Sequence, residues 1–149
     1  MGAKIVISLI LLLSISNSYG QVKNKPIWIL YNNSDSLSHK IDDGKVWYFS
    51  KSQFDNEPLH FYLDENSDFP DTIPIIPENI TLTTRKELIS IRKEHIENRS
   101  KVSGNDQNPF KDYFKNLNWF NQIYNPIFIV EPLDGVYLIY RVKYKYIII

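Results

Sequence analysis

Apolar and polar residues alternate in blocks along this chain, and the shorter apolar blocks predict strands. Each block is about six residues long and rich in aromatic or β-branched side chains, which is typical of strands in a sheet. The predicted strands occupy residues 26–31, 45–50, 58–63, 127–131 and 136 onward. Turn-forming residues predict a tight turn at Asp42–Gly44 and a four-residue turn at Pro132–Gly135.

Two other segments have the spacing of helices. Thr84 and Glu87 form a capping box, in which each residue satisfies a backbone amide of the other, and the helix that follows is predicted to end near residues 100–104. A second helix is predicted from Asn108–Pro109 to Pro126. Its apolar positions form one continuous stripe, namely Phe110, Tyr113, Phe114, Leu117, Phe120 and Tyr124.

The order of these elements is β-β-β-α-α-β-β, with strands and helices segregated along the chain. Such an order favours an α+β fold with an antiparallel sheet of about five strands and both helices on one face. The polar segment 32–40 and the proline-containing segment 64–77 are predicted to be connections without regular structure, because turn-forming residues and proline disfavour strands.

The first 20 residues resemble a leader for export. Lys4 precedes an apolar run of 11 residues, Ile5–Ile15, and small residues stand at Ser18 and Gly20. This pattern predicts a secretory signal peptide that is cleaved after Gly20, leaving 21–149 as a single secreted or periplasmic domain. The run is too short for a membrane span, which needs about 20 apolar residues, and without a cysteine the chain is not a lipoprotein.

The remaining composition is nearly neutral. One of the 17 basic residues lies in the predicted leader, which leaves 16 against 17 acidic residues. Such a chain has no overall field to attract nucleic acid, so no nucleic-acid partner is predicted. Three glycines follow the leader, each alone in its segment (Gly44, Gly104 and Gly135), so no glycine-rich nucleotide cradle and no cofactor is predicted.

Three basic residues close to the C-terminus raise the question of a polyanion site. Arg141, Lys143 and Lys145 alternate with Tyr144 and Tyr146. In a strand, alternate residues point to opposite faces, so these tyrosines lie on the face away from the cations. The pattern therefore predicts a half-solvated strand and no base-stacking surface, which would need both kinds of residue on one face.

The segment Asp64-Glu65-Asn66-Ser67-Asp68 contains a weak candidate metal site. Asp64, Asn66 and Asp68 have the D-x-N-x-D spacing of calcium loops. Phe69 stands where such a loop needs glycine, and Ile75 stands where it needs a bidentate glutamate. We therefore expect a solvated acidic turn here and predict no metal.

No residue is predicted to be catalytic, because the chain has no nucleophile motif of the G-x-S-x-G type. His39 and Asp42 are close in sequence, and His60 lies on a predicted strand. An alternative hypothesis is therefore a small exported hydrolase with a histidine and carboxylate site around these three residues.

The preferred hypothesis is a secreted or periplasmic binding or interaction module with a protein or glycan partner. Trp119 lies two positions after Leu117 and off the apolar stripe of the second helix, so it is expected to be exposed beside Phe120. An exposed tryptophan on an exported domain is a candidate ligand contact, while packing in the core is the alternative interpretation.

Overall fold

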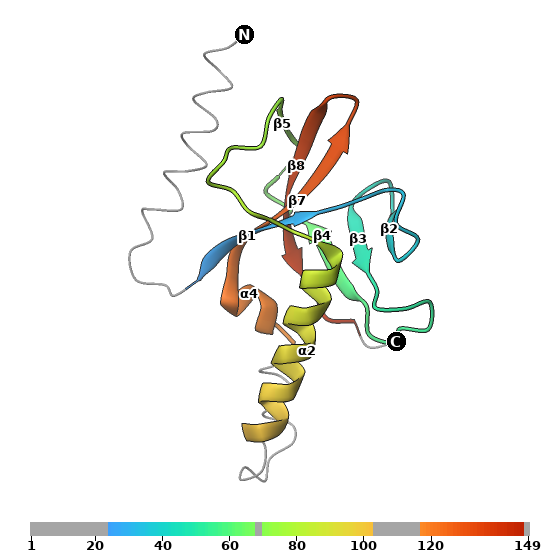
Figure 1. The fold of residues 1–149 in the computed structure, drawn as a ribbon, viewed down its shortest axis with the longest axis vertical. Coiled ribbons are helices and arrows are strands. Elements are labelled where there is room, and N and C mark those ends of the chain that lie inside the picture. The colour runs from blue at the N-terminus through green and yellow to red at the C-terminus, as the bar shows by residue number, and fades with distance from the viewer. Residues whose placement is uncertain (1–23, 68–69, 103–116, 148–149) are drawn as a thin grey trace.

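The computed structural model describes residues 24–67, 70–102 and 117–147 (Figure 1). The start of the predicted second helix, at Asn108–Pro109, lies outside these residues. Within them the structure is mixed α and β. The strands are β1 (Lys25–Leu30), β2 (Ser38–Ile41), β3 (Val46–Phe49), β4 (Leu59–Leu63), β5 (Asp71–Ile73), β6 (Leu82–Thr83), β7 (Tyr124–Leu133) and β8 (Val136–Tyr144), and the helices are α2 (Arg85–Val102) and α4 (Trp119–Ile123).

The eight strands form one curled sheet in the order β2-β3-β4-β8-β7-β1-β6, and β5 also pairs with β8. The predicted antiparallel sheet of about five strands is therefore only partly right. Strand β1 pairs in parallel with both β6 and β7, whereas the other pairs are antiparallel. The sheet is mixed because β1 joins the edge of β7 instead of pairing with its neighbours in sequence.

The three additional strands are short, and two of them lie wholly or mostly in the segments predicted to be irregular. Ser38–Ile41 ends the polar segment, Asp71–Ile73 lies between prolines, and Leu82–Thr83 directly precedes α2. Each is held by backbone pairing to a neighbouring strand, namely β3, β8 and β1 respectively. These segments are too short to show a clear alternation of apolar and polar residues. Their extended conformation therefore depends on pairing with the neighbouring strands.

Both predicted turns are present, and one is shorter than expected. Asp42, Asp43 and Gly44 have positive φ angles of 56°, 54° and 81° and connect β2 to β3. At the second turn, Asp134 and Gly135 have φ angles of 45° and 82°, while Leu133 already pairs with Val136. Positive φ at both central residues is the requirement of a two-residue hairpin turn, which explains the Asp-Gly pair.

The capping box at the start of α2 is confirmed. The Thr84 backbone amide donates to Glu87 Oε2 at 2.7 Å, and the Glu87 amide donates to Thr84 Oγ1 at 3.3 Å. Hydrogen bonds from the Thr84 backbone amide and from the Thr84 hydroxyl to the carboxylate lower the pKa of Glu87. The exposed carboxylate is also favourably placed near the positive end of the helix dipole.

The second helix ends earlier than predicted. Helix α4 stops at Ile123, and Tyr124 already begins β7, so Pro126 lies within a strand. The pairing of β1 with β7 is irregular between Lys25 and Ile27. Pro126 lies in the matching stretch of β7, between Tyr124 and Ile127. It is consistent with the irregularity, because proline cannot donate a hydrogen bond to the ladder.

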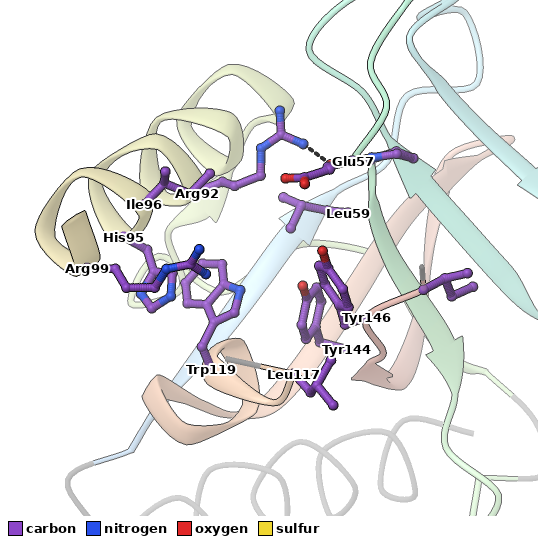
Figure 2. Close-up of a pocket in the computed structure, with 12 residues that line it drawn as sticks. Glu57, Leu59, Arg92, His95, Ile96, Arg99, Leu117, Trp119, Tyr144 and Tyr146 are labelled. Atoms are coloured by element: carbon purple, nitrogen blue, oxygen red, sulfur yellow. Dashed lines mark hydrogen bonds between the residues drawn. The ribbon is translucent and has the colours of Figure 1, made fainter. Parts of the chain in front are cut away.

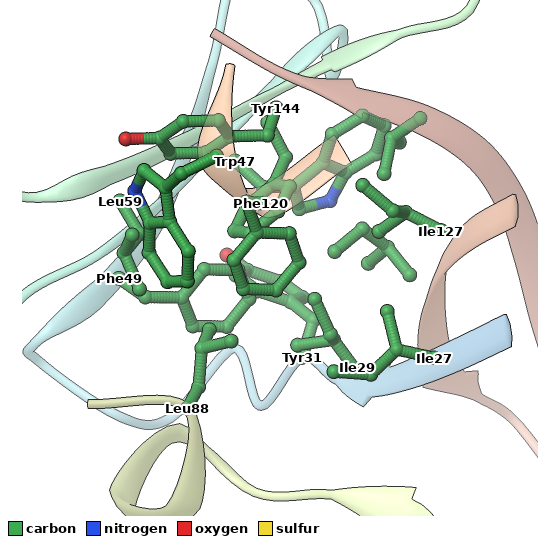
Figure 3. Packing of buried hydrophobic residues seen from close by; sticks show 14 residues of the cluster. Ile27, Ile29, Tyr31, Trp47, Phe49, Leu59, Leu88, Phe120, Ile127 and Tyr144 are labelled. Carbon is green, nitrogen blue, oxygen red and sulfur yellow. The ribbon is translucent and has the colours of Figure 1, made fainter. Parts of the chain in front are cut away.

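The main core lies between the sheet and the two helices (Figure 3). Leu88 of α2 and Phe120 of α4 are both fully buried in it, against Trp47, Phe49 and Phe61 of the sheet. A second, smaller cluster lies on the other face of the sheet, and its buried members are Ile73, Phe128, Val130 and Ile139. The sheet is therefore covered on both faces, but only in part on the second.

Replacing Phe61 by alanine is expected to lower the free energy of unfolding by about 3–5 kcal/mol, because it leaves a cavity among packed rings. Phe61 is fully buried and contacts the rings of Phe49, Phe120 and Tyr144. Phe54→Ala is the matched control, since Phe54 is 89% exposed, and it should change stability by less than about 0.5 kcal/mol. Urea unfolding measures both, and equal losses would contradict this packing.

Candidate functional site

A cavity of about 280 Å³ lies between α2, α4, the start of β4 and the segment that follows β8 (Figure 2). Its apolar walls include Leu59, Leu117 and Trp119. Its polar walls come mainly from α2 and from the tyrosines at the end of β8. Segments far apart in sequence therefore build it together.

Helix α2 contributes four side chains to the cavity from one face. Arg92, His95, Ile96 and Arg99 have the spacing i, i+3, i+4 and i+7, which places them in one row along a helix. The helix is predicted by the sequence, and its spacing alone indicates that these residues share a face. Nothing in the sequence indicates that this face meets the end of β8.

Trp119 is not exposed as expected, because only 7% of its surface is accessible. Its ring stacks on that of His95, with centroids 4.0 Å apart and planes 6° apart. It also meets Phe120 and Tyr144 edge-on. Trp119 therefore forms part of the core and one wall of the cavity, and its role as a ligand contact stays a prediction.

Tyr144 forms the adjoining wall together with Tyr146 (Figure 2). The side-chain amide of Asn121 holds the Tyr144 backbone with two hydrogen bonds, donating to its carbonyl at 2.8 Å and accepting from its amide at 3.0 Å. Burial raises the pKa of Tyr144 to about 12, against the effect of a hydrogen bond from Trp119. The phenol is therefore neutral at any physiological pH and acts as a hydrogen-bonding group only.

The rim of the cavity is held by an ion pair between α2 and the loop before β4. Arg92 Nη2 lies 3.1 Å from Asp55 Oδ2, and both side chains are largely buried. Arg92 also donates to the backbone carbonyl of Glu57. Burial opposes ionisation of Asp55, but hydrogen bonds from the amides of Lys51 and Glu57 and from Arg92 lower the pKa of this carboxyl. The positive charge of Arg92 is therefore balanced by the carboxylate of Asp55.

The three residues of the hydrolase hypothesis lie away from this cavity. His39 pairs with Tyr48, and Tyr48 pairs with His60, so the two histidines share one side of the sheet with the tyrosine between them. Their rings lie 4.9 Å and 4.4 Å from that of Tyr48. Asp42 is in the β2–β3 turn, and burial, Tyr48 and then the charge of Asp42 raise the pKa of Tyr62. None of these residues lines the cavity.

Asp64, one of the candidate metal ligands, makes ion pairs and a hydrogen bond with other residues. Its carboxylate lies 3.2 Å from Lys143 Nζ and 3.6 Å from Arg141 Nε, and it accepts a hydrogen bond from the amide of Asn66. Asp68 lies outside the described residues. Over residues 24–67, 70–102 and 117–147, no group of three or more histidine or acidic side chains is arranged to hold a metal ion.

The basic side chains of β8 are exposed, as expected for a half-solvated strand. Arg141 and Lys143 have side chains 47% and 55% exposed. Lys145 Nζ lies over the ring of Tyr62, 4.8 Å from its centroid. Tyr140 and Tyr144 of the same strand point away, but Tyr137 shares the face of the cations, and neighbouring strands bring Tyr62 and Tyr48 to that side. Sequence alternation within one strand cannot reveal this.

Comparison with known proteins adds no family. No protein-family model matches the chain, and neither a curated protein nor a solved structure matches it. Among the helices of the described residues, none is long and apolar enough to cross a membrane.

Removing the carboxylate of Asp55 is expected to destabilise the protein by about 3 kcal/mol, because it leaves the Arg92 charge buried without its partner. The matched control is Glu97→Ala. It removes one partner of the exposed ion pair between Lys93 and Glu97, which are 3.8 Å apart on α2, the helix that also carries Arg92. That change should cost less than about 0.5 kcal/mol. Chemical unfolding of Asp55→Ala and of the control measures both, and similar losses would show that the ion pair does not hold the rim.

Proposed function

We propose that this protein is an exported binding module whose ligand site is the cavity between α2 and the end of β8. The observation that supports the proposal is the composition of the cavity walls. Aromatic and aliphatic side chains surround a small number of polar groups, which is the usual character of a small-molecule site.

The size of the cavity limits what it holds. A volume of about 280 Å³ lies just below the usual range of ligand pockets, which begins at about 300 Å³. It suits a single sugar ring of a glycan or one large side chain of a protein partner. The tyrosine and tryptophan rings would cover the apolar faces of such a group, and the hydroxyls of Tyr144 and Tyr146 would contact its polar atoms.

Binding is proposed in preference to hydrolysis because of the side chains that line the cavity. The described lining includes one histidine, His95, one carboxylate, Glu57, and no serine, threonine or cysteine. His95 is stacked on Trp119. These groups are suited to recognition, whereas a nucleophile next to a base is the arrangement that covalent catalysis requires.

A ligand that occupies the cavity is expected to raise the unfolding temperature. Thermal unfolding of the purified protein with monosaccharides, oligosaccharides and aromatic amino acids tests this, because at about 100 times its dissociation constant a ligand adds about 2.7 kcal/mol. Ile96→Trp, which fills the cavity from the side of α2, should abolish any shift. Lys93→Trp, on an exposed part of the same helix, should retain it.

An equal loss with both variants would show that the ligand binds elsewhere. A panel without any shift would contradict the small-ligand form of the proposal.

Export is expected to leave a chain that begins at Gln21. We propose that the leader is removed after Gly20, on the pattern of the apolar run and the small residues before the cut. Mass spectrometry of the protein from the medium or the periplasm measures the N-terminus. Replacing Gly20 by a bulky residue such as tryptophan should block cleavage, while Ser14→Ala in the leader should not. Recovery of the intact chain from the cytosol would contradict export.

A further inference from the structure

His60 is a buried histidine without a visible polar partner. It lies on β4 next to Leu59, and the two side chains point to opposite sides of the strand. Leu59 faces the core and the cavity, whereas His60 lies on the other side and is only 3% exposed. Neither ring nitrogen has a hydrogen-bond partner among the described residues. Such a site favours the neutral imidazole, because the protonated ring carries two donors and a charge.

The side chains around His60 offer no described anion to stabilise its protonated form. Burial, and after it the charge of His39, lower the pKa of His60. On this side, strands β2 to β4 and the last residues of β8 place His39, Tyr48, Tyr62, Arg141 and Lys143, and Lys145 follows β8. Arg141 and the lysines are cations and the tyrosines are neutral.

Two carboxylates lie at the other end of β4. Asp42 lies in the β2–β3 turn. Asp64 directly follows the strand and is paired with Arg141 and Lys143. Neither contributes to the lowered pKa of His60. A proton on His60 therefore meets cations and aromatic rings.

The backbone of His60 connects this site to the cavity. The amide of Lys145 donates to the His60 carbonyl at 3.1 Å. The residues that follow, Tyr146 and Ile147, form part of the cavity wall. Tyr144, just before, is held separately by Asn121. A structural change at His60 would therefore be transmitted first to the part of the cavity wall formed by Tyr146 and Ile147.

We propose that His60 makes this cavity acid-sensitive, so that protonation of its ring releases residues 145–147 from β4 and opens the wall formed by Tyr146 and Ile147. This inference rests on the proposed function, since it describes how that ligand site is regulated. An exported protein would then hold its ligand at neutral pH and release it in an acidic medium.

The direction of the pH effect follows from the sign of the shift. The pKa of His60 is lowered from its ordinary value of 6.5, so the closed state binds fewer protons than the opened one. The closed state therefore has its full stability above pH 6.5 and loses it as the pH falls toward the lowered pKa. Histidine is the side chain whose ordinary pKa places such a change near neutral pH.

Hydrogen exchange of the Lys145 amide tests the proposal without any ligand. Between about pH 7.5 and pH 5, after correction for the intrinsic rate, its protection should fall by about tenfold for each pH unit within the titration range. In His60→Leu the corrected protection should no longer depend on pH. His39→Gln, which removes the neighbouring histidine, should retain most of the dependence.

A second measurement does not depend on the folding of any variant. The ring proton resonances of His60 in the unaltered protein should titrate below pH 6.5, and a midpoint at or above this value would overturn the proposal. The same pH dependence in His60→Leu as in the unaltered protein would also overturn it.

The outcomes separate the two proposals. If the exchange behaves as expected but none of the sugars or amino acids binds, the proposed function fails and the acid-sensitive wall stands. If a sugar or amino acid shifts the unfolding temperature equally at about pH 7.5 and at about pH 5, the inference about His60 fails and the binding site stands.

Discussion

The structure depends on the pairing of β8 with three other strands. One edge of β8 pairs with β7 along its length, from Val136 to Val142. The other edge pairs first with β5 and then with β4. Because successive side chains alternate, Ile139 enters the second cluster, whereas Val142 and Tyr144 enter the main core. One strand therefore supports both hydrophobic clusters, and the cavity is built where it ends.

Where the chain leaves β8, specific hydrogen bonds position the cavity walls. The amide side chain of Asn121 binds the Tyr144 backbone as a neighbouring strand would, and so attaches α4 to the sheet. On the opposite rim, the Asp55 carboxylate accepts hydrogen bonds from two backbone amides and forms an ion pair with Arg92. The ion pair attaches the β3–β4 loop to α2. Both contacts join segments distant in sequence, so the cavity depends on the complete fold.

The sequence predicts the long elements of this fold better than the architecture of the sheet. The strands with strong apolar patterns, the capping box at Thr84 and the Asp-Gly turns follow local rules, and the structure has them. The parallel pairing of β1 with β7 brings together residues about 100 positions apart, and no local pattern encodes it. The short strand at Asp71–Ile73 exists because the edge of β8 is there to pair with.

The same distinction applies to the candidate site. Helical spacing places Arg92, His95 and Arg99 on one face of α2, but the sequence does not indicate which surface this face meets. Trp119 was predicted to be exposed because only the stripe of its own helix was considered. In the structure His95 covers one face of its ring, and Tyr144 meets it edge-on. Burial of a single side chain is a property of tertiary packing, which a helical pattern reports only in part.

Asp55 and His60 are both buried near the cavity, but the fold favours opposite charge states for them. Asp55 is surrounded by donors, so the fold favours its ionised form and the loop around it is held firmly. His60 is buried without such partners among the described residues, so the fold favours its neutral form. Acid affects them unequally, because histidine titrates near neutral pH and a stabilised carboxylate only at much lower pH. A moderately acidic medium would therefore act on the His60 side of the cavity and leave the Asp55 rim closed.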